Sequence, residues 1–183
     1  MENYLVSVIK QFEYYKSLGD KTFNQLTFEE IQWQSNEDSN SISIIVKHIV
    51  GNMLSRWTHF LTEDGEKTWR HRDAEFKDTY TSFEDLIASW ESGWACLFSA
   101  LKSLKSEDLE RIIYIRNQGH TVTEALNRQL AHYPYHIGQI VFLGKLLKGN
   151  QWQSLSIPKG NSSKYNEEKF SKAKERRHFT DNL

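Results

Sequence analysis

A long run of apolar residues at helical spacing constrains the fold of this chain more than any other feature. Between residues 83 and 104 these residues recur every three or four positions, with one adjacent pair: Phe83, Leu86, Ile87, Trp90, Trp94, Leu97, Leu101 and Leu104. Such spacing places all of them on one face of an α-helix. Thr81, with Glu84 three residues later, predicts a capping box at its start. A seam of this length favours packing against other helices at small crossing angles, as in a helix bundle.

Three further segments carry the same pattern, which indicates a bundle of four long helices. Residues 3–18 and 42–61 have apolar side chains at helical spacing, and Ser41 can cap the second of them. The last segment, 122–148, follows a capping box at Thr121–Glu124 and ends before a glycine.

The connections complete the predicted fold. Thr27 begins a capping box for a short helix, and residues 111–123, RIIYIRNQGHTVT, read as a small hairpin. Residues 62–79 are charged and aperiodic, and loops of such length are often functional. We therefore predict an all-α protein, a four-helix bundle with a small hairpin-like crossover before the last long helix. Residues 1–166 form the bundle, and residues 167–183 form a short helix or tail.

Composition indicates which partners and which cellular compartment the sequence favours. The chain has 183 residues and a formal net charge of −1, so neither nucleic acid nor an anionic membrane is predicted as a partner. No apolar run approaches the roughly 18–20 residues of a membrane span. A single cysteine, Cys96, fits a reducing cytoplasm, and the N-terminus has no signal-peptide pattern. Cys96 falls among apolar residues of the 83–104 helix, where a cysteine is expected to be inert.

Two histidines four residues apart carry the most specific chemical signal. His132 and His136, in AHYPYHIGQI, lie on one face of the last predicted helix, with Cβ atoms about 5–6 Å apart. Two imidazoles so placed can share a divalent ion, and Pro134 between them predicts a kink or a π-bulge. His48, in the 42–61 helix, is the candidate third ligand. Three histidines would leave coordination positions open to water or substrate, as in catalytic sites.

Purely structural roles are also open for these residues. Half-buried histidines are commonly hydrogen-bonded core residues, and a proline can simply bend a helix. Asn52 and Gln129 share the helical rows of His48 and His132, so they could orient a ligand or a water molecule, or could be exposed to solvent. Arg56, one turn after Asn52, could hold a carboxylate of a substrate or form an ordinary salt bridge.

Three stretches of the sequence resemble one known family. These are KHIVGNMLSRWTHFLTEDGEK around His48, HYPYHIGQI around His132 and His136, and LSIPKGNS after the last long helix. In combination they resemble the DinB/YfiT-like superfamily of metal-dependent four-helix-bundle proteins, in a branch described as a domain of unknown function. The likeness covers residues 3–166.

The resemblance implies both a fold and a site. It implies an up-up-down-down-type bundle with a long crossover, a tendency to form homodimers, and a bound metal ion. Three imidazoles suit zinc, nickel, copper or iron, so they leave the identity of the divalent ion open. In that superfamily one metal-binding histidine lies on the second helix and two on the last, which match His48, His132 and His136. Relatives with assigned activities are S-transferases that use low-molecular-weight thiols, or metal-dependent isomerases and hydrolases.

Two functions therefore remain open from the sequence. The first is a metal-dependent enzyme, with a thiol-dependent S-transferase acting on small molecules as the leading form and a hydrolase as another. The second is a non-catalytic, stress-related dimeric bundle that binds a metal or a ligand. A solvent-accessible cavity beside the three histidines would favour the enzyme.

Overall fold

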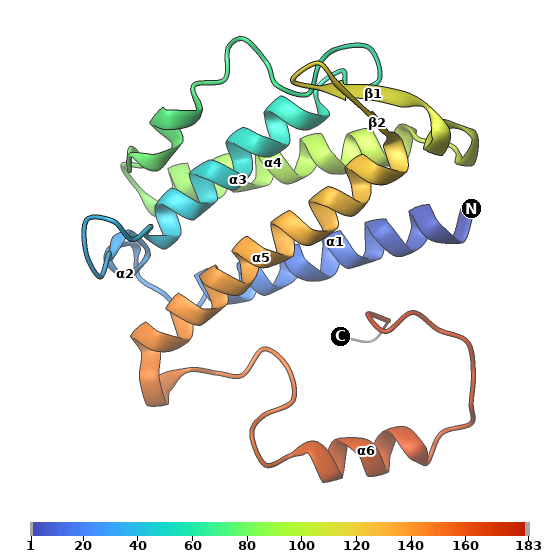
Figure 1. Cartoon of the computed structure of the whole chain (residues 1–183). Helices are drawn as coiled ribbons and strands as arrows, with labels where there is room; N and C mark the ends of the chain where they lie inside the picture. The colour runs from blue at the N-terminus through green and yellow to red at the C-terminus, as the bar shows by residue number, and fades with distance from the viewer. Residues whose placement is uncertain (1, 182–183) are drawn as a thin grey trace.

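The protein is mostly helical in the computed structural model, which describes residues 2–181. Four long helices pack side by side: α1 (Glu2–Phe23), α3 (Ile42–Trp57), α4 (Phe83–Ser103) and α5 (Val122–Lys148) (Figure 1). Helix α3 packs mainly against α4, and α1 packs mainly against α5. All four helices bury an apolar face in a single core, as the helical spacing of their apolar residues predicts.

The direction of the helices differs from the expected up-up-down-down order. Helices α3 and α4 run in the same direction, whereas α1 and α5 run in the opposite direction, which is an up-down-down-up order (Figure 1). The chain lengths explain this. The connection through α2 (Phe28–Gln32) returns the chain beside α1, whereas residues 58–82 are long enough to carry it back to the other end of the bundle before α4 begins.

Large aromatic side chains fill the middle of the core. Trp90 and Trp94 of α4 are fully buried, and Trp94 lies edge-on to Phe12 of α1 and to Tyr133 of α5. Helix α1 continues to Phe23, past the predicted end at residue 18, and packs closely against Trp90 there. A Cβ atom at Gly19 would lie 2.7 Å from the Trp90 ring, so a glycine at this position leaves room for the indole.

Several helix ends differ from the predictions. Helix α3 ends at Trp57 rather than at residue 61, because Thr58 is extended and His59 adopts a positive φ of 47°. The cap of α4 lies one residue later than predicted. The Ser82 hydroxyl accepts a hydrogen bond from the Asp85 amide, and Thr81 contributes only its backbone N–H, which donates to the Asp85 carboxylate.

The other connections follow the sequence more closely. The capping boxes at Thr27 and Thr121 are both present. The predicted hairpin forms from β1 (Ile112–Ile115) and β2 (Gln118–Thr121), which pair antiparallel.

The C-terminal segment contains one short helix followed by a tail. Helix α6 (Ser162–Phe170) begins five residues before residue 167, the start of the segment named from the sequence, and ends at Phe170. The tail returns to α1, where Lys10 pairs with Asp181. Within residues 2–181, no helix has the length and apolar character needed to cross a membrane.

Candidate metal centre

His48 is fixed in the middle of α3 by burial. It lies on the side of α3 that faces α5, and only 7% of the residue is exposed. Its ring stacks on Phe76 from the 3₁₀ segment η1 (Arg72–Phe76), with ring centroids 5.3 Å apart. The long 58–82 connection therefore covers this histidine, and the imidazole cannot turn away to solvent.

His132 and His136 lie one turn apart on α5, as their spacing predicts. Their Nε2 atoms are 3.1 Å apart, and both residues are half-buried. Helix α5 continues as an α-helix through Pro134 without a π-turn, so the predicted π-bulge is wrong. Because proline removes only one backbone donor, the residues on either side of it can keep their α-helical hydrogen bonds.

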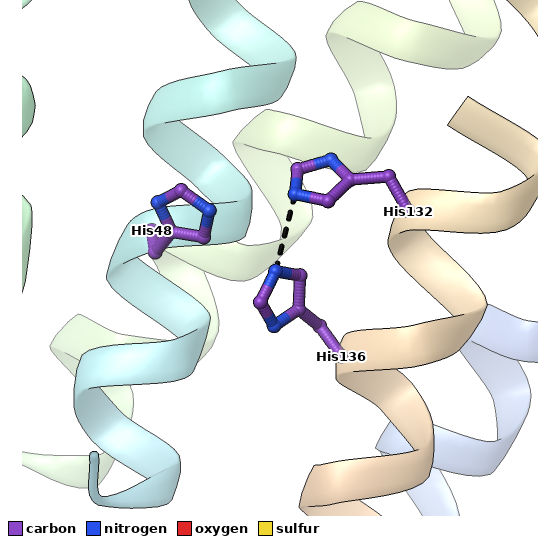
Figure 2. A group of neighbouring side chains, drawn as sticks. All are labelled: His48, His132 and His136. Carbon is purple, nitrogen blue, oxygen red and sulfur yellow. Dashed lines mark hydrogen bonds between the residues drawn. The ribbon is translucent and has the colours of Figure 1, made fainter. Parts of the chain in front are cut away.

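The three rings converge on one point between α3 and α5. Figure 2 shows His48 reaching from α3 toward His132 and His136, which reach back from α5. One nitrogen from each ring lies within 4.8 Å of the corresponding nitrogens of the other two. Residues 84 positions apart in the sequence, His48 and His132, thus share a single cluster, as the sequence predicts.

Each ring has an oxygen acceptor at its other nitrogen. The Nδ1 atoms of His132, His136 and His48 lie 3.1 Å from Gln129 Oε1, 2.8 Å from Gln139 Oε1 and 2.9 Å from Glu75 Oε2, respectively. An oxygen at this distance holds the ring proton on Nδ1, which leaves the Nε2 atom with a lone pair. The ring orientation and tautomer are thus set for ligation through Nε2.

The acceptor of His48 differs from the other two because it is an anion held by a second cation. Arg70 donates from Nε to Glu75 Oε1 at 2.7 Å and from Nη2 to Glu75 Oε2 at 3.0 Å. Glu75 is only 6% exposed. A glycine in α3 makes room for it, since a Cβ atom at Gly51 would lie 2.3 Å from Glu75 Oε1.

The surroundings of the cluster favour the neutral form of His132 and His136 and the charged form of Glu75. Burial first, and then the cost of adding a proton beside His136, His48 and the arginines, lowers the pKa of His132 to about 4, and burial also lowers the pKa of His136. Burial alone would raise the pKa of Glu75, but hydrogen bonds from His48 and Arg70 outweigh it and lower that pKa. Neutral imidazole is the form that ligates metals.

The arrangement fits a divalent metal ion. Two Nε2 lone pairs that face each other at 3.1 Å repel unless a proton or a cation lies between them. Nitrogen–metal bonds of about 2.0–2.1 Å that meet near a right angle place the two nitrogens about 3 Å apart. His132 and His136 already have this separation, and His48 supplies the third donor across the helix interface.

A cavity of about 330 Å³ opens beside His48 and His132. All three neighbours predicted from the sequence, Asn52, Arg56 and Gln129, line this cavity and are buried. Gln129 also contacts His132. Because Gln129 and Asn52 are both buried, the alternative that they are exposed to solvent is wrong.

The other two predicted neighbours are held in different ways. Tyr133 donates a hydrogen bond to Asn52 Oδ1 at 3.0 Å, and Trp57 donates to the Tyr133 hydroxyl. Arg56 makes no salt bridge within residues 2–181, which removes the ordinary explanation for that arginine. Cys96 is half-buried and lines a different cavity, together with Trp57 and Thr58.

Sequence reasoning missed the partners of two histidines. Gln139 lies three residues after His136, at the spacing that Gln129 has before His132, so helical periodicity alone could have identified it. Glu75 and Arg70 come from the aperiodic connection and have no such signal. The one available hint was Gly51, a glycine in the interior of a strongly apolar helix, where it is costly unless something packs against it.

Comparison with known proteins gives a family without a function. No curated protein and no solved structure matches the chain. A family model described as "Protein of unknown function (DUF1572)" matches residues 1–161, which include the four long helices and all three histidines. The match ends one residue before α6 begins. Because it covers most of the chain, the protein belongs to the DUF1572 family.

Proposed function

We propose that the protein is a metal-dependent enzyme of the DinB/YfiT-like type, in which His48, His132 and His136 hold one divalent ion. One observation carries this proposal: each of the three rings has its Nδ1 atom against an oxygen, so that three Nε2 lone pairs face one point. A histidine that serves only as a packed core residue has no need for its second nitrogen to face two others. The expected ion is zinc, nickel or iron, since three imidazoles suit each of them.

The proposed reaction is transfer of a low-molecular-weight thiol to a small electrophile. A divalent ion at this site would lower the pKa of a coordinating thiol or water and so supply a nucleophile at neutral pH. The residues of the chain hold and orient the ligand rings, and the cavity beside His48 and His132 gives a substrate access to them. Hydrolysis is the corresponding reaction with water, and the choice between the two reactions rests on the resemblance.

The adjoining cavity favours an enzyme over a non-catalytic metal- or ligand-binding bundle. A structural metal site is normally closed by four protein ligands, whereas catalytic sites keep a position open. Here three histidines face one another, and two of them also line the cavity. The non-catalytic, stress-related dimer is the outcome if metal binds but no turnover follows.

Metal analysis followed by an activity screen tests the proposal. Protein purified without chelators should carry about one zinc, nickel or iron ion per chain, because three imidazoles make one site. Wild type and His48→Ala would then be compared for transfer of cysteine or glutathione to a chromogenic electrophile, and for hydrolysis of activated esters. A wild type that neither carries nor takes up a divalent ion would contradict the proposal.

We also propose that the protein is a homodimer in the cytoplasm. Three large side chains of α5, Tyr135, Phe142 and Leu146, form an exposed apolar stripe with 63%, 66% and 56% of their surfaces accessible. An apolar stripe of this kind is a candidate subunit interface. Sedimentation of wild type and Phe142→Glu measures this directly, since the charge should produce monomers. The cytoplasmic location stays a prediction from the single cysteine.

A further inference from the structure

The cavity beside the histidines is surrounded by positive charge. Within the described part of the chain, residues 2–181, its lining contains no carboxylate but five arginines: Arg56, Arg70, Arg72, Arg116 and Arg128. They come from α3, from the long 58–82 connection, from the turn between β1 and β2, and from α5. Four separate segments therefore direct guanidinium groups to one small space, although the formal net charge of the whole chain is −1.

The acidic groups nearest to these arginines are already engaged. Arg70 takes up both oxygens of Glu75 and also donates to Glu66 at 3.2 Å. Arg116 lies 3.4 Å from the same Glu66 oxygen, and 60% of its side chain is exposed. Arg72 lies over the ring of Phe76, 5.1 Å from its centroid. Within residues 2–181, the cavity therefore keeps an excess of cations after these ion pairs are taken into account.

Arg56 is the most informative of the five because it is buried without a partner. Only 5% of the residue is exposed, and its Nε and Nη1 atoms are buried with no hydrogen-bond acceptor among residues 2–181. A buried cation without a partner is costly. The surroundings are nevertheless shaped for it, since a Cβ atom at Gly65 would lie 3.0 Å from Arg56 Nη1 and crowd the guanidinium.

We infer that the cavity binds a small molecule through an oxyanion, a carboxylate or a phosphate, which pairs with Arg56 and Arg128 while the rest of the molecule extends toward His48 and His132. Guanidinium groups bind both oxyanions through paired N–H donors. A volume of about 330 Å³ suits a small metabolite. This inference names the substrate class of the proposed enzyme, and only its placement of the reacting group near the histidines rests on the proposed function.

Anion titration of the full chain tests the inference. Inorganic phosphate and succinate, as separate probes, would be titrated into metal-loaded and chelator-treated wild type, with heat and thermal unfolding as readouts. At least one probe should bind both forms of the wild type. Arg56→Met should weaken binding of that probe about tenfold or more, and Arg128→Gln should weaken it severalfold, because each removes charge-assisted hydrogen bonds to the anion. Phosphate binding alone identifies a phosphate ester class, and succinate binding alone identifies a carboxylate class.

Matched variants separate a ligand site from a structural role. Arg111→Gln removes an exposed arginine that pairs with Asp108 outside the cavity, and it should leave anion binding unchanged. Without anion, Arg56→Met should unfold at the same or a higher temperature than wild type, since replacing an unpartnered buried charge by an apolar side chain is commonly stabilising. Arg128 is exposed, so Arg128→Gln provides a second test that does not disturb the core.

The outcomes distinguish this inference from the proposed function. Metal uptake without binding of either probe, or probe binding that Arg56→Met and Arg128→Gln leave unchanged, would overturn the anion site and leave the metal centre standing. Probe binding that requires Arg56 in a protein that takes up no metal would support the anion site and remove the proposed enzyme.

Discussion

The two walls of the candidate metal centre are built in different ways. On α5, His132 and His136 and their acceptors, Gln129 and Gln139, all come from eleven consecutive residues of one helix. On the opposite wall, His48 of α3 is oriented by Glu75, which lies 27 residues away and is itself held by Arg70. The first wall is local and neutral. The second is assembled from a helix and a connection, and it contains a series of hydrogen bonds from the charged Arg70 through the charged Glu75 to His48.

This difference shows what each wall contributes. An i, i+3 glutamine fixes the ring of its histidine as soon as the helix forms, so the α5 wall needs little tertiary structure. The α3 wall exists only when the 58–82 connection is folded against the helix. A carboxylate also makes the ring a better electron donor than a neutral amide does. The α3 wall therefore couples ligand strength to the packing of a long connection.

Removing one wall at a time should give the largest effects. His48→Ala leaves the His132–His136 pair and should weaken metal binding more than about 100-fold, beyond what loss of an outer hydrogen bond costs. The double variant His132→Ala/His136→Ala leaves one ligand and should abolish stoichiometric binding. Titration with zinc and nickel, monitored by calorimetry, measures both. Equal affinity of His48→Ala and wild type would show that the α3 wall is not part of the site.

Changing the acceptors alone should give intermediate effects that differ between the walls. Glu75→Gln should weaken metal binding about 10- to 100-fold, and Gln139→Ala about tenfold or less, because a carboxylate supports its histidine more strongly than an amide. Glu107→Gln, an exposed glutamate in another 3₁₀ segment (η2, Ser106–Glu110), is the control and should bind normally. The same zinc titration ranks the three. A larger loss for Gln139→Ala than for Glu75→Gln would reverse the comparison.

A methyl group at Gly51 should act on the α3 wall through Glu75. Gly51→Ala places a Cβ atom 2.3 Å from the Glu75 carboxylate, so Glu75 must move and metal affinity should fall up to about tenfold. Gly138→Ala is the matched control on α5, where the added Cβ would meet no atom of another segment within 4 Å among residues 2–181.

The control variant should differ from Gly51→Ala in both metal affinity and folding stability. Gly138→Ala should keep its metal affinity and gain roughly 0.5–1 kcal/mol of folding stability, because alanine favours the helix interior. Urea unfolding measures the stability and zinc titration the affinity. A Gly51→Ala variant that gains stability and keeps wild-type affinity would show that Glu75 is not held where the structure places it.

The smallest effect concerns the pH dependence of folding without metal. The pKa of His132 is lowered from 6.5 to about 4, so the unfolded chain protonates this ring at a higher pH than the folded protein does. The stability contribution is therefore intact above pH 6.5, declines as the pH falls, and is lost below about 4. His132→Gln should flatten the stability curve in this window when urea unfolding is measured with chelator. The exposed-site control His59→Asn should follow the wild type.

The sequence predicts much of the fold and one wall of the site. Capping residues predicted the α5 boundaries, turn residues predicted the hairpin, and helical periodicity predicted the paired histidines, because each depends on residues close together in the chain. Periodicity placed the end of α3 four residues too late, since no pattern announces the positive φ of His59. Sequence patterns could not predict that Glu75 pairs with His48, or that Arg56 has no partner among residues 2–181. Both depend on where an aperiodic segment lies in space.

The 58–82 connection serves two purposes with the same residues. It reverses the chain so that α3 and α4 can be parallel, and it delivers Arg70 and Glu75 to His48 (Figure 1). Loops are usually where homologous proteins tolerate insertions and deletions most readily. A deletion here would also displace Arg70 and Glu75 from His48. We therefore expect the length of this connection to vary little among proteins that keep the three histidines.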